Sequence, residues 1–183
     1  MVKTSPLVMD LDDDGIKEIV FGTLDGYLIA LEPDGSFQEG DWPLYTGGQY
    51  WGSPAAEDMD NDGTTEIVIG NHNGKLFIID PFAEVEQQYQ LASFLVGTPA
   101  IGHLNSNDFP DVVIGSVGEN SKLFAMEYDS TIMNGFPVEI NENMFTGAAL
   151  ADFNGDELDD IVIATDSDNL YLYNNEGELF TGF

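Results

Sequence analysis

Residues 10–18 read Asp-Leu-Asp-Asp-Asp-Gly-Ile-Lys-Glu, and residues 58–66 read Asp-Met-Asp-Asn-Asp-Gly-Thr-Thr-Glu. Both segments place oxygen-bearing side chains at positions 1, 3 and 5, and the glycine at position 6 allows a sharp turn that brings them together. A carbonyl at position 7 and a carboxylate at position 9 complete a cage of oxygen ligands. A solvated acidic turn would not require the same order twice, so we interpret both segments as calcium loops. The predicted ligands are Asp10, Asp12, Asp14, Ile16 and Glu18, and Asp58, Asp60, Asp62, Thr64 and Glu66.

The two loops belong to an internal repeat. Related segments start at residues 10, 58, 103 and 152, so the starts are 48, 45 and 49 residues apart. Nine residues after each start comes a short apolar run, namely Ile-Val-Phe-Gly, Ile-Val-Ile-Gly, Val-Val-Ile-Gly and Ile-Val-Ile-Ala. A turn-rich link and a third strand with leucine at one equivalent position then follow, which predicts a small antiparallel meander in each unit. The predicted repeats are approximately 1–48, 49–93, 94–142 and 143–183, within a single domain.

The fourth strand of each unit is less regular. Residues 42–45 and 136–139 share an aromatic-Pro pattern in the first and third units, and residues 88–94 are expected to fill this role in the second. The fourth unit stops where the others would begin this strand. Short runs of β-branched and aromatic residues, punctuated by proline and glycine, predict an all-β chain without helices. The fold class expected is a β-propeller-like array of four four-stranded antiparallel blades, each with a metal loop between its first and second strands.

The third and fourth loops differ from the first two. In the fourth we predict binding through Asp152, Asn154, Asp156, Leu158 and Asp160, weakened by strain because Glu157 stands where glycine would be easiest. The third offers a single carboxylate among His103, Asn105, Asn107 and Asp111, which leaves most of the desolvation of Ca²⁺ uncompensated. We expect this degenerate loop to hold no calcium ion and to be closed by asparagine hydrogen bonds. A transition metal at His103 would need partners that the sequence does not reveal. The chain is thus expected to bind about three Ca²⁺.

Composition limits the classes of partner. The 183 residues include 34 acidic side chains against four lysines and no arginine, giving a formal net charge of −30. Nucleic acid and anionic membranes are poor partners for such a chain. No apolar run approaches the roughly 20 residues of a membrane span, so membrane insertion is not expected. Cysteine is absent, so neither a disulfide framework nor a thiol nucleophile is available.

The loops with their following strands, over residues 10–22, 58–70 and 152–164, resemble the calcium-binding FG-GAP repeats of integrin α-subunit propellers and their bacterial relatives. Residues 26–35 and the Trp-Pro and Phe-Pro strands resemble the bacterial type in particular. Only Phe21 and Gly22 keep the first half of the name motif, and no Gly-Ala-Pro follows. The resemblance implies calcium-stabilised blades on a secreted or cell-surface adhesion protein that binds a protein or glycan ligand.

The oxygen-rich cages favour calcium over magnesium, because Ca²⁺ accepts six to eight oxygens in flexible geometry. Extracellular calcium modules bind with dissociation constants on the order of 10⁻⁴ to 10⁻³ M, so the loops would be filled outside the cell and largely empty inside it. We therefore expect an extracellular or cell-surface location.

An enzymatic role is not expected, because most carboxylates have a structural assignment and Gly115-Ser116-Val117-Gly118 lacks the spacing of a nucleophile elbow. Two alternatives to a binding module stay open. The chain could be the non-catalytic propeller portion of a polysaccharide-active enzyme, or it could be a structural spacer or assembly module.

The number of blades leaves ring closure open. Four units could close alone, belong to a larger ring, or form half of a ring completed by a homodimer. We predict that the termini meet and that the N-terminal segment helps to complete the last blade, within one chain or between two. A ligand surface is expected on the face opposite the metal loops, with Trp51 packed between blades and Tyr50 exposed. The predicted ligand-binding residues are Gln49, Tyr50, His72 and Asn73.

Overall fold

The computed structural model describes residues 1–129 and 131–181. This part of the chain contains strands and turns and no helix, which confirms the predicted all-β class. Accordingly, the described residues include no helix of the length and apolar character needed to span a membrane. The strands form four antiparallel sheets, and each sheet is made of strands that follow one another in the chain.

The first sheet consists of β1 (Leu7–Met9), β2 (Glu18–Gly22), β3 (Tyr27–Leu31) and β4 (Leu44–Tyr45). The second consists of β5 (Ala55–Glu57), β6 (Glu66–Gly70), β7 (Lys75–Ile79) and β8 (Val85–Gln90). The third consists of β10 (Ala100–Gly102), β11 (Asp111–Val117), β12 (Lys122–Glu127) and β13 (Val138–Glu139), with β9 (Phe94–Leu95) paired to β11. The fourth consists of β14 (Ala149–Ala151), β15 (Asp160–Ala164) and β16 (Leu170–Tyr173).

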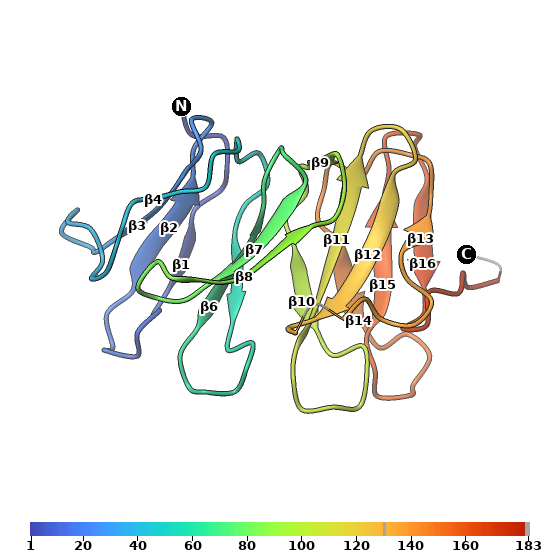
Figure 1. Ribbon diagram of the computed structural model, residues 1–183. Coiled ribbons are helices and arrows are strands. Elements are labelled where there is room, and N and C mark those ends of the chain that lie inside the picture. The colour runs from blue at the N-terminus through green and yellow to red at the C-terminus, as the bar shows by residue number, and fades with distance from the viewer. Residues whose placement is uncertain (130, 182–183) are drawn as a thin grey trace.

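The four sheets stand side by side in chain order, as the blades of a propeller do (Figure 1). The registers repeat from sheet to sheet, since Val20 pairs with Leu7 and Ala30, and Val68 pairs with Ala55 and Ile78. Every residue of β6 is buried, because the second sheet is covered on both faces. In β2, buried and half-buried residues alternate, because only one face of the first sheet is covered.

The fourth strands of the first and third sheets lie where the aromatic-Pro pattern placed them, at β4 and β13, and each follows a cis X-Pro bond. The second unit differs from the prediction, because its outer strand β8 is made by residues 85–90. Phe94 and Leu95 belong instead to β9, which pairs with Val117 and Ser116 of the next sheet. The fourth sheet has three strands in the described part of the chain. The first two sheets have four strands each, and the third has four in its main path with β9 as a fifth.

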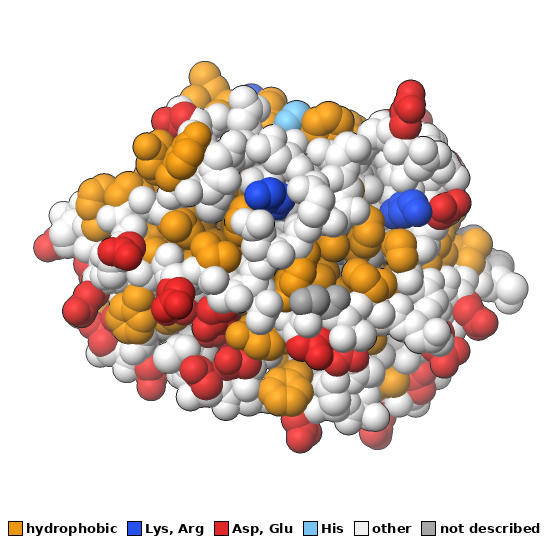
Figure 2. All heavy atoms as spheres, in the orientation of Figure 1, with side chains coloured by type: hydrophobic (Ala, Val, Ile, Leu, Met, Phe, Trp, Pro, Cys, Tyr) orange, Lys and Arg blue, Asp and Glu red, His pale blue; other side chains and the backbone are white. Residues whose placement is uncertain are grey.

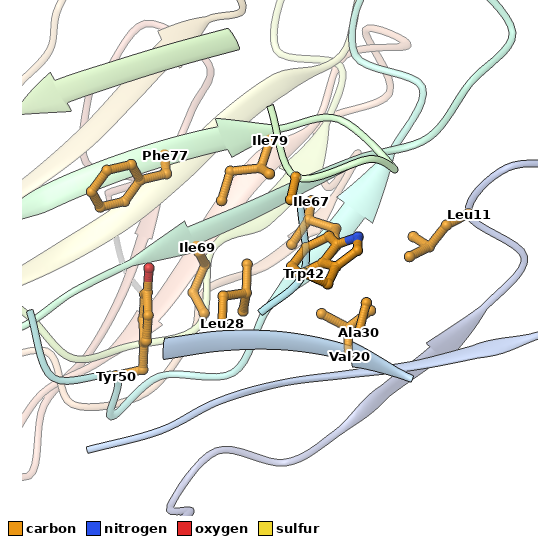
Figure 3. Packing of buried hydrophobic residues seen from close by; sticks show 11 residues of the cluster. Leu11, Val20, Leu28, Ala30, Trp42, Tyr50, Ile67, Ile69, Phe77 and Ile79 are labelled. Atoms are coloured by element: carbon orange, nitrogen blue, oxygen red, sulfur yellow. The ribbon is translucent and has the colours of Figure 1, made fainter. Parts of the chain in front are cut away.

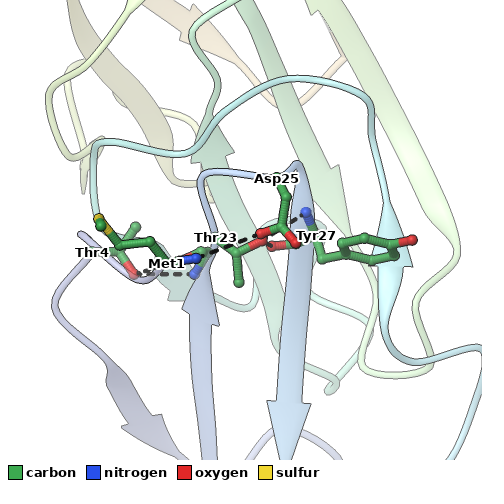
Figure 4. Close-up of polar contacts among 6 residues, drawn as sticks. Met1, Thr4, Thr23, Asp25 and Tyr27 are labelled. Atoms are coloured by element: carbon green, nitrogen blue, oxygen red, sulfur yellow. Dashed lines mark hydrogen bonds and ion pairs between the residues drawn. The ribbon is translucent and has the colours of Figure 1, made fainter.

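The prediction that the termini meet within one chain was wrong. The first and fourth sheets, which contain the described ends of the chain, lie at opposite ends of the array (Figure 1). The N-terminal segment joins its own first sheet, where Val2 forms a bridge with Thr23 and the Met1 carbonyl accepts the N–H of Leu24 at 2.9 Å. The Thr4 hydroxyl oxygen also accepts the N–H of Gly22 at 3.1 Å. Figure 4 shows Met1 and Thr4 next to Thr23. Pairing between two chains is taken up below.

Candidate functional site

The three loops that were predicted to bind calcium and the degenerate third loop all lie at one edge of the sheets (Figure 1). Each loop leaves the first strand of its sheet and returns into the second, so the meander itself carries the loops to a common edge. Acidic side chains gather over this lower edge of the molecule in Figure 2. The edge is therefore strongly negative, as a surface that recruits cations would be.

The ninth position of every loop is a buried carboxylate. The four side chains are no more than 1% exposed. Each accepts a hydrogen bond from the backbone N–H of the second loop position, and this bond closes the loop at its base. The four bonds join Leu11 to Glu18 at 2.7 Å, Met59 to Glu66 at 2.8 Å, Leu104 to Asp111 at 2.8 Å and Phe153 to Asp160 at 2.8 Å.

Burial raises the pKa of all four of these carboxyl groups, because a charged carboxylate loses solvation inside the protein. The pKa of Glu66 rises to about 7, with smaller contributions from the nearby charges of Glu86 and Asp60. The pKa of Asp111 rises to about 6, again mainly through burial. A cation bound in the loop would supply the positive charge that favours the ionised form of a buried carboxyl group.

The first two loops bring carboxylates together most closely. Among the described residues, two groups of three acidic side chains have ligand oxygens within 4.8 Å of one another, one in each of these loops. Two oxygens bound to one Ca²⁺ at 2.3–2.6 Å lie at most about 5 Å apart, so this spacing suits a shared calcium ion. The groups are Asp10, Asp12 and Glu18, and Asp58, Asp60 and Asp62.

The first loop also contains an oxygen without a partner. Asp10 Oδ1 is buried and has no hydrogen-bond partner, which is costly unless a cation completes the site. Gln38 lies against the same loop and donates from Nε2 to Asp12 Oδ2 at 2.7 Å. Its own Oε1 is likewise buried and unpartnered. Sequence reasoning missed Gln38, because it lies 26 residues from Asp12 and the equivalent positions of the third and fourth units are Met133 and Phe180.

The predicted ligands at the fifth position also shape the turn. The fifth-position side chains accept the N–H of the seventh residue, and these bonds join Ile16 to Asp14 at 2.7 Å, Thr64 to Asp62 at 2.8 Å and Leu158 to Asp156 at 2.9 Å. Such short-range bonds hold the loop in a tight, preformed turn. The carbonyls of Ile16, Thr64 and Leu158 remain the predicted seventh-position ligands.

The fourth loop shares the backbone of the first two but not their carboxylate spacing. In loops one, two and four, both the fourth and the sixth residues have positive φ, namely Asp13 and Gly15, Asn61 and Gly63, and Gly155 and Glu157. Glu157 has φ of 72°, which matches the predicted strain at a residue with a side chain. Asp152 accepts the N–H groups of Gly155 and Glu157, which lowers its pKa. Asn154 donates to Asp156 Oδ2 at 2.9 Å.

The third loop has a different backbone. Neither Ser106 nor Asp108, its fourth and sixth residues, has positive φ. Asparagines close the loop, as predicted: Asn105 Nδ2 donates to Asp111 at 3.2 Å, and the N–H of Asn107 donates to Asn105 Oδ1 at 2.8 Å. The backbone N–H of His103 donates to Asp159 of the fourth unit at 2.8 Å. The first residue of this loop therefore takes part in contact between neighbouring sheets.

The predicted ligand surface needs one correction. Tyr50 was expected to be exposed, but it is fully buried and packs with Leu28 and Ile69 between the first two sheets (Figure 3). Its hydroxyl lies 2.5 Å from Thr46 Oγ1, so its polar end is satisfied inside the protein. Trp51, which was expected to pack between blades, is 39% exposed.

The other three residues of that prediction do come together. The N–H of His72 donates to the Gln49 carbonyl at 2.8 Å, and Asn73 Nδ2 donates to the Gly47 carbonyl at 3.2 Å. Trp51 Nε1 donates to Gln49 Oε1 at 3.1 Å. These residues lie at the edge opposite the metal loops, since they connect strands at the other end of the sheets.

Three ring side chains form an aromatic row at this opposite edge. The centroids of Trp51 and His72 are 6.0 Å apart, and those of His72 and Phe94 are 4.6 Å apart. Lys3 Nζ lies 5.5 Å from the Trp51 ring, within the range of a cation–π contact. Trp51 and Phe94 are each more than one third exposed, so the row presents rings to solvent.

Residues 10–69 match the family model described as an FG-GAP-like repeat. This part of the chain is therefore similar to an FG-GAP-like repeat. The match covers the first two loops and the strands between them, so it includes two of the three loop segments on which the sequence resemblance rested; residues 152–164 lie outside it. A comparison with curated protein sequences gave no significant match.

Solved structures share the fold of this chain. BBS1N, solved in complex with ARL6DN, aligns with a TM-score of 0.64 at 16% identity, covering 98% of this chain and 50% of that one. BamB from Moraxella catarrhalis aligns with a TM-score of 0.66 at 17% identity, covering 96% of this chain and 47% of that one. The computationally designed Ika4 protein aligns with a TM-score of 0.64 at 11% identity, and 91% of its chain is covered. This chain thus spans about half the length of the first two and nearly all of the third.

Proposed function

We propose that this chain is an extracellular calcium-binding FG-GAP-like propeller module, and that the face opposite its metal loops binds a protein or carbohydrate partner. The observation that carries the proposal is the first loop, where three acidic ligand oxygens lie within 4.8 Å of one another and Asp10 Oδ1 is buried without a partner. A bound cation would stabilise such a cluster of like charges by compensating it.

In this proposal Asp10, Asp12 and Glu18 hold one ion, and Gln38 positions Asp12 from the neighbouring turn. Asp58, Asp60, Asp62 and Glu66 hold a second ion. The fourth loop holds a third ion through Asp152, Asn154, Asp156 and Asp160. The bound ions supply positive charge at the loop edge of the first, second and fourth sheets. The third loop needs no ion, because its asparagines already close it.

Calcium removal tests the metal part of the proposal. At a concentration 100 times the dissociation constant, one bound ion stabilises the fold by about 2.7 kcal/mol. We therefore expect the melting temperature to rise in millimolar calcium relative to chelator, and titration calorimetry to report about three sites. Equal melting curves in calcium and chelator would exclude a structural role for the ion.

Two fifth-position variants make this test specific. Asp62 and Asn107 occupy equivalent positions, and each accepts the N–H of the seventh residue of its loop at 2.8 Å. Asp62→Ala should remove one calorimetric site and part of the calcium-induced rise in melting temperature. Asn107→Ala should leave the full calcium response, because its loop is expected to hold no ion. An equal loss in both variants would show that the response is not due to the loops.

The aromatic row of Trp51, His72 and Phe94 supports the partner-binding part of the proposal. Exposed tryptophan and phenylalanine can stack on a sugar ring or anchor a protein loop, and a few such residues usually dominate an interface. We expect Trp51→Ala to weaken binding to a partner found by glycan and protein screening at least tenfold, or about 1.4 kcal/mol. Calcium affinity should not change. Phe82→Ala is the matched control, because Phe82 is 43% exposed in a turn of the second sheet away from the row.

Cleavage of a screened polysaccharide by the chain would instead favour an enzyme. Absence of any binding after wide screening would favour the spacer interpretation.

A further inference from the structure

Each apolar core of this chain lies between two neighbouring sheets. The described residues contain three such cores, one at each junction between successive sheets. Each of the first three sheets has one face that meets the following sheet. A valine of the second strand and a leucine of the third strand recur on this face. In the first three sheets these residues have no exposed surface; they are Val20 and Leu28, Val68 and Leu76, and Val113 and Leu123.

The fourth sheet has the same residues on the same side, but nothing covers them in the described part of the chain. Val162 is half-buried and Leu170 is 52% exposed. Phe153, at the second position of the fourth loop, is 56% exposed, whereas Leu11, Met59 and Leu104 at that position are fully buried. We call the surface formed by Phe153, Val162 and Leu170 the trailing face. It is an inter-sheet face without its neighbour.

The first sheet has the complementary opening. Its residues on the opposite side are all partly exposed, whereas their equivalents in the second sheet are at most 2% exposed. We call the residues of the first sheet the leading face: Ile19, Phe21, Ile29 and Leu31. The leading and trailing faces lie at opposite ends of the array (Figure 1), so one chain cannot join them.

Side-chain sizes match across this opening. At each junction, the second strand of a sheet has a glycine, and a side chain of the following unit packs directly against it. A Cβ atom at the glycine would clash with that side chain. The glycines and entering residues are Gly22 and Tyr50, Gly70 and Leu95, and Gly115 and Met144. The fourth sheet has alanine, Ala164, at this position, and the entering position of the first unit is the smaller Val2. Ala164, which has a methyl group where the other three sheets have glycine, is thus matched by Val2, the smallest of the four entering side chains.

The backbone places Val2 at this entering position. The N–H of Leu24 donates to the Met1 carbonyl at 2.9 Å, just as the N–H of His72 donates to the Gln49 carbonyl at 2.8 Å. Met1 and Val2 therefore correspond to Gln49 and Tyr50. Val2 is 51% exposed, so it is available for contact.

Charges match as well. At the junction of the third and fourth sheets, Asp159 exchanges two hydrogen bonds of 2.8 Å with the backbone of His103. These are the eighth residue of one loop and the first residue of the preceding loop. The equivalent residues at the open junction are Lys17 and Asp152, which have opposite charges.

We infer that two copies of this chain close into one ring, with the leading face of each copy packed on the trailing face of the other. A twofold axis makes both junctions identical, so the assembly ends at two copies and does not grow into a fibre. The two copies together would have about the length of the BBS1N and BamB chains, of which one copy spans 50% and 47%. This assembly does not depend on the partner-binding role proposed above.

Light scattering during size-exclusion chromatography of the full chain in calcium buffer tests the inference. We expect one species of about twice the 20.0 kDa chain mass. Leu170→Asp should convert it to a monomer, because an acidic side chain cannot be buried at the junction without a partner. Val85→Asp is the matched control and should stay dimeric, since Val85 is also the exposed first residue of a strand but lies on an outer strand of the second sheet.

A monomeric wild type, an open series of larger oligomers, or a dimeric Leu170→Asp variant would each overturn the inference. Paired size changes give a second test that does not depend on folding of the aspartate variant. Val2→Tyr should overfill the site at Ala164 and raise the dimer dissociation constant at least tenfold. Adding Ala164→Gly should restore dimerisation by recreating the arrangement of Gly22 and Tyr50. Failure of this rescue would show that Val2 does not enter that site.

Discussion

Tyr50 illustrates how a single residue can be placed wrongly by a sound rule. Neighbours in an extended segment point in opposite directions, so either Tyr50 or Trp51 had to enter the core. The choice depended on Gly22, which lies 28 residues earlier and leaves room for the Tyr50 ring because it has no side chain. The sequence favours Trp51 as the buried residue, because large aromatic side chains near the start of a strand commonly pack between sheets. The sequence alone does not reveal whether Tyr50 or Trp51 faces Gly22.

We predict that Tyr50→Ala lowers the free energy of unfolding by about 3–5 kcal/mol, as expected for a large side chain removed from a tight core. Trp51→Ala should cost less than about 1 kcal/mol, because that residue is partly exposed and lies outside the core clusters. Urea unfolding of both variants in calcium buffer measures the difference. Similar losses in the two variants would contradict the packing seen at Tyr50.

Glu66 links stability to pH. Burial raises its pKa from 4.5 to about 7, so between these values the folded chain binds more protons than the unfolded chain does. Without calcium, the contribution of Glu66 to stability is therefore present at low pH and is lost as the pH rises through about 7. Calcium requires the deprotonated carboxylate, so its stabilising effect should grow over the same window.

We predict that the rise in melting temperature caused by calcium is larger at about pH 8 than at about pH 5. Glu66→Gln should reduce this pH dependence, because the glutamine does not titrate. Melting curves in calcium and in chelator, recorded across that range, measure both effects. A calcium response of constant size would mean that the buried carboxylates are not coupled to the ion.

At the scale of elements, the loops and strands were the most predictable part of the chain. Position 9 could be identified from sequence because the apolar run that follows sets its register, and all four such residues are buried as that register requires. The outer strands were less predictable, since β8 and β9 divide a polar segment whose pairing depends on two different sheets. Gln38 was missed for the same reason, because its role depends on a contact between distant turns.

The backbone of the fourth loop can be tested by a substitution at its sixth residue. Glu157 has φ of 72°, and a residue with a side chain pays roughly 1–2 kcal/mol in that region. We predict that Glu157→Gly stabilises the chain by up to about 1 kcal/mol in calcium buffer.

Asp108→Gly is the control, because Asp108 is the sixth residue of the third loop and does not have positive φ. This change should destabilise the chain by about 0.5–1 kcal/mol, since glycine adds freedom to the unfolded chain without relieving strain. Thermal unfolding of both variants shows whether each substitution raises or lowers the stability of the chain. The same sign for both would contradict the different backbones of the two loops.

At the scale of the whole molecule, negative charge greatly exceeds positive charge. The net charge is −30, and three calcium ions would bring it only to −24 (−30 + 6). Among the described residues, one ion pair joins side chains, between Lys122 and Glu139 at 3.1 Å. We therefore expect repulsion among the acidic side chains to be relieved mainly by ions from solution, both at the loops and over the rest of the surface.

We predict that the calcium-free chain melts at a higher temperature as sodium chloride is raised from about 0.01 M to about 1 M, because the screening length falls from about 30 Å to about 3 Å. Millimolar calcium at matched ionic strength should add a further rise, since screening does not fill the cages of the first two loops. The Asp62→Ala variant should keep the sodium effect and lose part of the calcium effect. A calcium effect equal to that of sodium chloride at the same ionic strength would mean that calcium acts on this protein only by screening its charge.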